Sequence, residues 1–432
     1  MSAPNDKSAG PGPAAPIGSE SASRPAERRP GQPRTIADLS GQHLRVFLHA
    51  DPYALHEPAA AEAVPPSTLR GLLERGQRVF VGTELTRAFT QETNIATLED
   101  LAEHVSERLN AEVLMPEELV GDSLAKVSQD LRPGQICLLP DLSKAEADVQ
   151  SGEALSRRLA TYLDAFVGDA FSVSHLHDRG LSSLPRLVRQ RVIGYRMQYE
   201  VERLREIGRP ESAPLVLVVG GERFADKASL LSRWLPRASH IVLGGGVANT
   251  LLAALGHAMG QSTFEPERVA EARTFMSKAR SLGVELILPM DLAVRTSSAA
   301  WVKGTVVQAA RTDEPAEIVA LGKVREEQAV VDLGPESIQR ASEVLGRAGS
   351  ALWWGPLGRA DARGAAASTS ALAQALGSPS LFAVAFGGDL RRALIGLDPA
   401  LIQGIELIST GSNAAQTLLA GRRLPGADVG EQ

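Results

Sequence analysis

The second half of the chain repeats one pattern, a short apolar run that ends in a turn of glycine, proline or aspartate. Such runs are typical of strands buried on both faces, and the segments between them have the length and polarity of helices. Alternation of this kind predicts βαβ units and a mostly parallel sheet with helices on both faces. The expected strands are 215–219, 240–243, 285–288, 350–353 and 381–386.

The first half carries the same alternation in a weaker form. Strands are expected at 45–51, 79–81, 112–114, 136–139 and 165–167, with helices at 69–75, 98–109 and 153–163. A long helix from about Leu187 to Ile207, ended by Gly208 and Pro210, is the expected connection between two domains. A chain of 432 residues is too long for one ordinary core, which also favours two domains.

Composition narrows the class of protein. Hydrophobic residues make up 44% and charged residues 22%, as in ordinary globular proteins. A net charge of −6 offers no basic field to nucleic acid or to a membrane surface, and the sequence lacks a transmembrane run and a signal pattern. The single cysteine, Cys137, lies in an apolar run and is expected to be a buried small side chain. These features favour a cytoplasmic protein.

The first 34 residues differ from the rest. They are rich in Pro, Ala, Ser, Gly and Arg without apolar periodicity, which predicts a disordered tail. Its arginines offer a contact for an unknown acidic protein partner, although a solvated arm is the simpler interpretation.

Glycine-rich turns follow the strands of the second half. The turn at 220–227 has paired glycines before a helix with the cations Arg223 and Lys227 near its start. The turn at 244–250 has three glycines, and the third turn is 386–389. Glycine N–H groups and helix N-termini favour a phosphate, although a tight turn before a capped helix explains the first segment as well. Asp389 in the third turn suits magnesium or a helix cap, and both interpretations stay open.

These turns, in this order, resemble the phosphoglycerate kinase family. The resemblance continues through 288–291, 332–335, 352–358, 408–411, 418–421 and 424–426. In the first half, Asp51, Arg87 and the segment 166–171 follow the same path, so that the resemblance covers about residues 35–428.

The resemblance implies two Rossmann-like parallel-sheet domains joined by a hinge helix. An acceptor-type domain would span 35–186, an interdomain helix 187–209 and a nucleotide-binding domain 210–411, with 412–432 packing back on the first domain. One domain would hold an acidic three-carbon acceptor and the other Mg²⁺ with ATP or ADP, and hinge closure would bring them together. A monomer is expected.

The resemblance also implies site residues. Arg223 and Lys227 would be catalytic, Asp51 and Arg87 would bind the acceptor, and Asp389 would bind the metal. The implied nucleotide-binding residues are Gly220, Gly221, Lys227, Gly244, Gly245, Asn249, Gly355, Pro356, Asp361, Gly387 and Gly388.

The acceptor-binding half departs from the family. Where the family has arginines that hold the acidic acceptor, this chain has Ser143, Leu176 and, at about the same place, Ala61. A family histidine is replaced by Glu84, and a family asparagine by Tyr53. Because each charge-assisted hydrogen bond is worth about 1.5–3 kcal/mol, these losses lower the expected acceptor affinity by some orders of magnitude.

The nucleotide-binding half departs less. Trp354 stands where the family has an asparagine, Phe386 where it has a glycine and Leu390 where it has a threonine. We expect these side chains to take room and a hydroxyl from a phosphate site.

Three functions therefore remain open. The first, which the residues favour, is a divergent nucleotide-binding homologue, a pseudoenzyme for the transfer between 1,3-bisphosphoglycerate and ADP. The second is a working phosphoglycerate kinase of glycolysis or carbon fixation, and the third a phosphotransferase with another acceptor.

Overall fold

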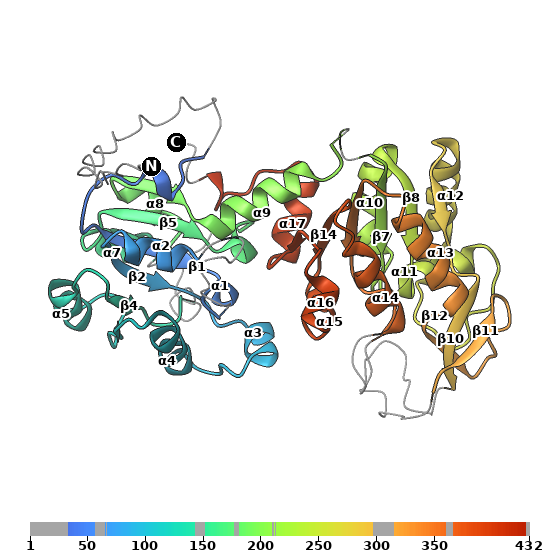
Figure 1. Ribbon diagram of the computed structural model, residues 1–432, viewed down its shortest axis with the longest axis horizontal. Helices are drawn as coiled ribbons and strands as arrows, with labels where there is room; N and C mark the ends of the chain where they lie inside the picture. Colours follow the sequence, from blue (N-terminus) through green and yellow to red (C-terminus); the bar gives the residue numbers. More distant parts are fainter. Residues whose placement is uncertain are drawn as a thin grey trace, which may run out of the picture. The chain divides into compact units, whose positions relative to one another are not determined.

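The computed structural model describes residues 33–56, 65, 67–142, 152–176, 181–209, 211, 213–296, 315–359 and 366–428. The strands in these ranges form two six-stranded sheets, each parallel throughout, and one three-stranded antiparallel sheet (Figure 1). The two parallel α/β sheets expected from the alternating pattern are confirmed. The predicted tail lies outside the described residues, apart from its last positions.

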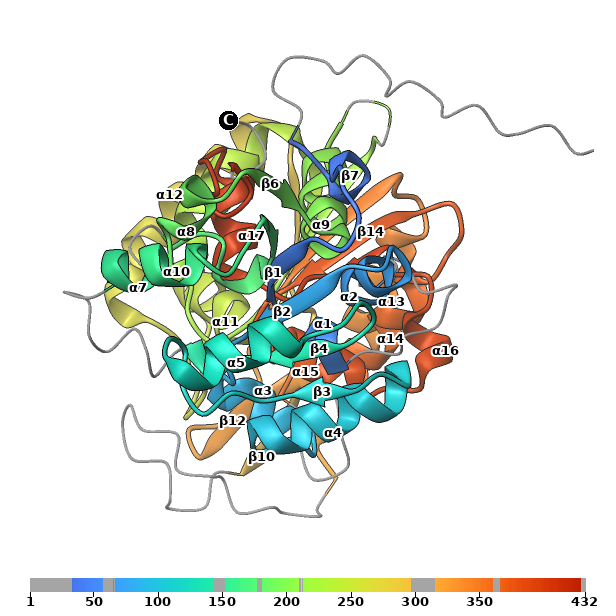
Figure 2. The ribbon, with the colours of Figure 1, turned by 90° about the vertical axis from the view of Figure 1, so that its left-hand side faces the viewer.

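The first parallel sheet is built from the N-terminal half. Its strand order is β3-β4-β2-β1-β5-β6, and β1 and β2 lie side by side in both views (Figures 1 and 2). Chain order reverses between β1 and β5, so the residues that follow these two strands meet at one edge of the sheet. The strands are β1 (Arg45–Ala50), β2 (Arg78–Gly82), β3 (Val113–Leu114), β4 (Ile136–Leu138), β5 (Ala165–Asp169) and β6 (Gln190–Ile193).

Helices of this half follow local signals closely. The expected helix 98–109 has these same bounds in the structure, as α4. The Thr97 hydroxyl accepts the N–H of Asp100 in the first turn, and Asn110 ends the helix in a left-handed conformation. Cys137 is fully buried on β4, and burial raises the pKa of its thiol to about 12. The helices are α1 (Pro52–His56), α2 (Thr68–Glu74), α3 (Arg87–Glu92), α4 (Leu98–Leu109), α5 (Asp122–Asp130), α7 (Gly152–Ala160), α8 (Leu184–Leu187) and α9 (Tyr195–Glu206), with a 3₁₀ turn η3 (Phe171–Val173).

The predicted long helix from Leu187 is wrong in its first part. Gln190–Ile193 pairs with β5 as the edge strand β6, and the helix begins only at Tyr195 as α9. Ile193 also donates its N–H to the carbonyl of Arg34 at 2.8 Å. The β-branched pair Val192 and Ile193 suits a pleated, buried strand, which explains the difference.

The second parallel sheet has the order β15-β14-β13-β7-β8-β9. Its chain order reverses between β7 and β13, the point at which ligands bind in open α/β sheets. Its strands are β7 (Leu215–Val219), β8 (Ala238–Leu243), β9 (Glu285–Ile287), β13 (Ser350–Trp354), β14 (Phe382–Phe386) and β15 (Leu407–Ile408). The helices of this half are α10 (Ala225–Trp234), α11 (Gly245–Ala254), α12 (Val269–Ser281), α13 (Pro335–Leu345), α14 (Ala367–Leu376), α15 (Gly388–Ile395), α16 (Pro399–Ile402) and α17 (Ser412–Leu419).

The antiparallel sheet was not anticipated from the sequence. It has the order β11-β10-β12 and joins β10 (Asp291–Thr296), β11 (Glu317–Ala320) and β12 (Gln328–Leu333). Leu292, Val294 and Val319 are buried in its small core. Each of its strands holds an apolar run of only three residues and β11 is largely exposed, so the apolar pattern marks them weakly.

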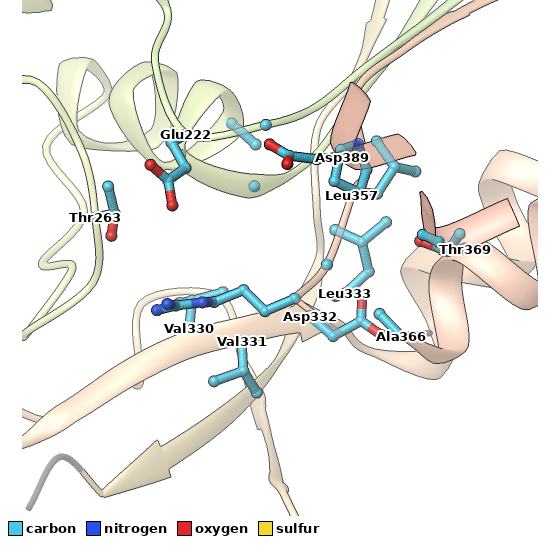
Figure 3. Close-up of a pocket in the computed structure, with 18 of the residues that line it drawn as sticks. Glu222, Thr263, Val330, Val331, Asp332, Leu333, Leu357, Ala366, Thr369 and Asp389 are labelled. Carbon is cyan, nitrogen blue, oxygen red and sulfur yellow. Dashed lines mark hydrogen bonds between the residues drawn. The ribbon is translucent and has the colours of Figure 1, made fainter. Parts of the chain in front are cut away.

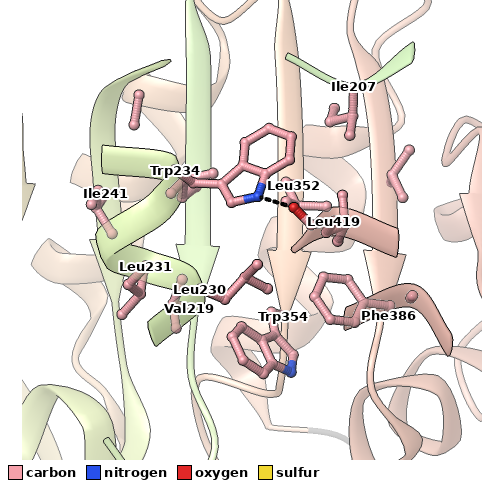
Figure 4. Close-up of a cluster of buried hydrophobic side chains, with 14 of the residues drawn as sticks. Ile207, Val219, Leu230, Leu231, Trp234, Ile241, Leu352, Trp354, Phe386 and Leu419 are labelled. Carbon is pink, nitrogen blue, oxygen red and sulfur yellow. Dashed lines mark hydrogen bonds between the residues drawn. The ribbon is translucent and has the colours of Figure 1, made fainter. Parts of the chain in front are cut away.

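The C-terminal helix α17 contacts both α9 and η3. The N–H of Gly426, beyond this helix, donates to the carbonyl of Ser174 at 3.0 Å. The indole of Trp234, at the end of α10, donates to the carbonyl of Leu419, at the end of α17, at 3.1 Å (Figure 4). In the ranges that the structure covers, no helix has both the length and the apolarity needed to cross a membrane.

Candidate functional site

A pocket of about 440 Å³ opens at the carboxyl edge of the second sheet, beside the point where its chain order reverses. This volume lies in the usual range for small-molecule and cofactor sites. Glu222 and Asp389 lie on one side of the pocket, and Asp332 lies across from them (Figure 3). Five of the predicted nucleotide or metal residues line it, namely Gly221, Gly245, Asn249, Pro356 and Asp389.

Other predicted glycines do not line the pocket but pack against neighbouring turns. A Cβ at Gly220 would be 2.0 Å from the carbonyl oxygen of Pro356, and a Cβ at Gly355 would be 2.8 Å from the carbonyl oxygen of Gly220. At Gly244 it would be 2.7 Å from the Cβ of Leu357. These glycines allow the turns after β7, β8 and β13 to pack against one another.

Helix N-termini point toward the same space. Helix α11 begins at Gly245 and α15 begins at Gly388, next to Asp389, while Gly387 caps α15 with φ +119°. The N–H groups of a first helical turn lack partners in the helix and attract phosphate. The arrangement therefore suits an anionic ligand, although the individual roles of these residues stay predictions.

The predicted cation Arg223 has a carboxylate partner that the sequence did not reveal. Its Nε lies 3.4 Å from the Oε1 of Glu265, whose other oxygen accepts from the N–H of Ala225 at 2.9 Å. Glu265 is buried, whereas the Arg223 side chain is 61% exposed. Arg223 is thus held at the start of α10, and Glu265 lies 42 residues away, with no local signal for the pair.

Lys227 contacts an aromatic ring. Its Nζ lies 3.7 Å from the centroid of the Trp354 ring, and Trp354 stacks on Phe386 with the centroids 5.2 Å apart. Burial lowers the pKa of Lys227 to about 8, although Asp226 and Asp389 act in the opposite direction. Cation–π contacts of this kind stabilise the ammonium most where water is excluded.

Trp354 and Phe386 do not take room from the pocket, contrary to expectation. Both are buried in the hydrophobic cluster on one face of the second sheet (Figure 4). Leu390 is also fully buried, on the other face. Trp354 and Phe386 are paired in register on neighbouring parallel strands, so their side chains project to the same face and stack.

Carboxylates near the pocket fit a metal only in part. Asp389 is 70% exposed and pairs with Arg392, while Asp332 is buried and accepts the N–H of Ser368 at 3.1 Å. Burial raises the pKa of Asp332. Among the described residues, no group of three or more His, Cys, Asp or Glu side chains could hold a metal. Mg²⁺ that arrives with nucleotide phosphates needs one or two carboxylates, and Asp389 fits that role.

Predicted acceptor residues lie at the edge of the first sheet. Asp51 is buried, and its carboxylate accepts from the N–H of Ser172 at 3.0 Å, from the Ser172 hydroxyl and from the Thr410 hydroxyl at 3.3 Å. Arg87 lies exposed in the first turn of α3 and is not among these partners. The structure therefore does not bring the two predicted acceptor residues into contact.

Tyr53 belongs to a packed polar cluster. Its hydroxyl donates to Glu92 at 2.8 Å, and Glu92 pairs with Arg391 at 2.9 Å. The guanidinium carbon of Arg391 lies 3.8 Å from the centroid of the Tyr53 ring. Burial and the hydrogen bond to Glu92 raise the pKa of Tyr53. We call these three residues the Tyr53–Glu92–Arg391 cluster.

A second buried charged group surrounds Asp51. Burial raises the pKa of Asp169 to about 7, and the Asp51 charge adds to this effect. Glu200 is also buried, which raises its pKa, and it accepts from the hydroxyls of Ser409 and Thr410, each at 2.6 Å. Arg196 is 8% exposed, and burial lowers its pKa although Glu200 and Asp51 act against that shift.

Several sequence-based expectations fall outside the described residues. These are Asp361 and the substituted positions Ala61 and Ser143. Leu176 is described and is 37% exposed. Glu222, Arg359 and Arg392 also line the pocket. Glu222 lies inside the glycine turn 220–227 but was given no role, and no glycine turn includes Arg359 or Arg392.

Comparison with known proteins gives consistent matches along the chain. The family profile described as phosphoglycerate kinase matches residues 60–422. A curated phosphoglycerate kinase of Thermomicrobium roseum is 31% identical over 402 residues, covering 92% of this chain and 98% of that protein. One from an Anaeromyxobacter species is 29% identical, covering 91% of this chain and 97% of that protein.

Solved structures give the same result for the fold. The phosphoglycerate kinase of Coxiella burnetii matches with a TM-score of 0.70 at 25% identity, covering 92% of this chain and 98% of that one. The enzyme of Pyrococcus horikoshii matches with a TM-score of 0.67 at 22% identity, covering 92% of this chain and 99% of that one.

Proposed function

Because this chain belongs to the phosphoglycerate kinase family, we propose that it binds an adenine nucleotide with Mg²⁺ but does not perform the family's phosphoryl transfer. The transfer in question is the one between 1,3-bisphosphoglycerate and ADP. The observation that carries this proposal is the Tyr53–Glu92–Arg391 cluster, in which a buried cation already has a carboxylate and a ring as partners.

Nucleotide binding is supported by the pocket at the edge of the second sheet. Gly245 and Asp389 lie in the first turns of two helices that start at this pocket, and Arg359 and Arg392 add cations to its wall. Bound Mg²⁺ neutralises phosphate charge. Asp389 would hold it from the protein side, and the glycine turns would let backbone N–H groups approach the phosphates.

Two described cations near the acceptor side are already engaged by carboxylates. Arg391 is paired with Glu92, and the charge of Arg196 interacts with Glu200 and Asp51. An acidic acceptor would have to compete with these carboxylates, and breaking a buried pair costs about 3–5 kcal/mol. This argument supports a protein that has kept the nucleotide and lost the usual acceptor.

A calorimetric titration of the full chain with MgADP and MgATP tests the first part. We expect binding that weakens when EDTA removes Mg²⁺ and also weakens in Asp389→Asn. Absence of heat at millimolar nucleotide would reject nucleotide binding and leave only a protein-binding role.

A coupled assay with ATP and 3-phosphoglycerate tests the second part. We expect no turnover above background. Turnover that is abolished in Lys227→Ala would instead establish a working phosphoglycerate kinase. The retained Lys227 and the match over 98% of a curated relative favour this second candidate. Nucleotide binding without 3-phosphoglycerate turnover leaves a phosphotransferase with another acceptor as a third candidate.

The cytoplasmic location, the monomeric state and a protein partner for the N-terminal segment also stay predictions.

A further inference from the structure

Lys227 does not itself line the pocket, but its ammonium lies near Gly221, which does. A Cβ built on Gly221 would be 3.9 Å from Nζ of Lys227, and Gly221 lines the pocket. The long lysine side chain starts in the first turn of α10 and reaches back toward the turn after β7. Its charge is therefore next to the place where a phosphate would meet the glycine N–H groups.

The Trp354 ring is what contacts this ammonium, at 3.7 Å from its centroid. Trp354 itself is held firmly, because it is 4% exposed and stacks on Phe386 with 21° between the ring planes. A free lysine side chain has many accessible rotamers, so a fixed ring beneath it limits where the charge can lie. The carboxylates that act on Lys227 are Asp226 on α10 and Asp389 at the start of α15.

We propose that Trp354 is a positioning residue, whose ring holds the Lys227 ammonium at the Gly221 end of the pocket, where it meets a nucleotide phosphate. This inference rests on the proposed nucleotide binding. It assigns a role to an indole that was expected, from the sequence alone, to lie in the phosphate site. The alternative is that the ring withholds Lys227 from the ligand.

The test compares ring-retaining with ring-free variants in the full chain. We expect Trp354→Phe to bind MgADP within about threefold of the wild type, and Trp354→Leu about thirtyfold more weakly, since a desolvated cation–π contact is worth about 2 kcal/mol. In a Lys227→Ala background, Trp354→Leu should have no further effect. Trp354→Met is a second ring-free variant in case the leucine variant does not fold.

A spectroscopic signature separates positioning from packing. Reductive methylation with ¹³C-formaldehyde labels the lysines and keeps their charge, and the Lys227 resonance is assigned by its loss in Lys227→Ala. It should be shifted upfield by the ring in the wild type and in Trp354→Phe, and should return to the ordinary position in the ring-free variants. Trp353→Phe is the matched control, since Trp353 lies on the same strand in the cluster of the other face and should leave the resonance in place.

The outcomes are distinguishable. If the wild type does not bind MgADP, nucleotide binding fails and this inference fails with it. If the wild type binds and the ring-free variants bind equally well or more tightly, only the positioning role of Trp354 is overturned. An unshifted Lys227 resonance in the wild type also overturns it.

Discussion

Arg391 and Glu92 form an ion pair at 2.9 Å although their side chains are only 10% and 6% exposed. The pair joins α15 to α3, two helices that pack in different halves of the chain. Charges that are so far removed from water require a partner, because a lone buried charge is strongly unfavourable.

The buried pair predicts unequal effects of single and double substitutions. Arg391→Met leaves Glu92 buried beside Tyr53, with Arg392 at 3.9 Å as a more distant cation, and should lower the free energy of unfolding by up to about 3–5 kcal/mol. The double variant Glu92→Leu with Arg391→Met removes both charges and should cost less. Urea unfolding measures both, and a double variant less stable than Arg391→Met would contradict the interpretation.

Lys227 predicts a pH dependence of nucleotide binding. Its pKa of about 8 means that the amine loses its proton as the pH rises through 8, so MgADP affinity should fall between pH 7 and 9. Calorimetry at these pH values measures the change. Lys227→Arg is the control, because a guanidinium stays charged and should remove the fall.

The same shift predicts a stability effect of known sign. Between pH 8 and 10.5 the unfolded chain binds more protons at this site than the folded chain, so the wild type gains stability as the pH rises. The free energy of unfolding of the wild type, relative to Lys227→Met, should therefore increase across this window. A constant difference would show that burial does not disfavour the ammonium.

Asp169 predicts the opposite trend at lower pH. Its pKa of about 7 lies above the ordinary 3.8, so between these values the folded chain binds more protons than the unfolded chain. Wild-type stability relative to Asp169→Asn should fall as the pH rises from 4 to 7. The asparagine keeps an oxygen for the N–H of Met197, which Asp169 accepts at 3.0 Å, and thermal unfolding at a series of pH values gives the comparison.

Gly220 predicts a steric effect. A methyl group there would lie 2.0 Å from the carbonyl oxygen of Pro356, so Gly220→Ala should cost about 1–3 kcal/mol and weaken MgADP binding. Gly346→Ala is the matched control, since its Cβ would find its nearest neighbour at 3.5 Å and its φ is −62°. Equal stability of the two variants would contradict the close packing of the turns.

Local signals made much of this fold predictable. Apolar runs identified the core strands, and Thr97 and Asn110 set both ends of α4. The resemblance placed Asp389 at the pocket. What could not be predicted depends on contacts between distant segments, such as Glu92 with Arg391, 299 residues apart. Trp354 was expected in the pocket. The sequence alone does not show that Trp354 and Phe386 are paired on neighbouring strands, and this register directs both rings to the same buried face.

The fully buried Cys137 makes the chain convenient for labelling experiments. With its pKa near 12, the thiol is almost wholly protonated at neutral pH and should not react with maleimides while the chain is folded. Since it is the single cysteine, any cysteine introduced on the surface would be the only reactive one. Spin labels or fluorophores attached in pairs, for example on α4 and α12, could then report how the distance between the two halves changes when nucleotide is added.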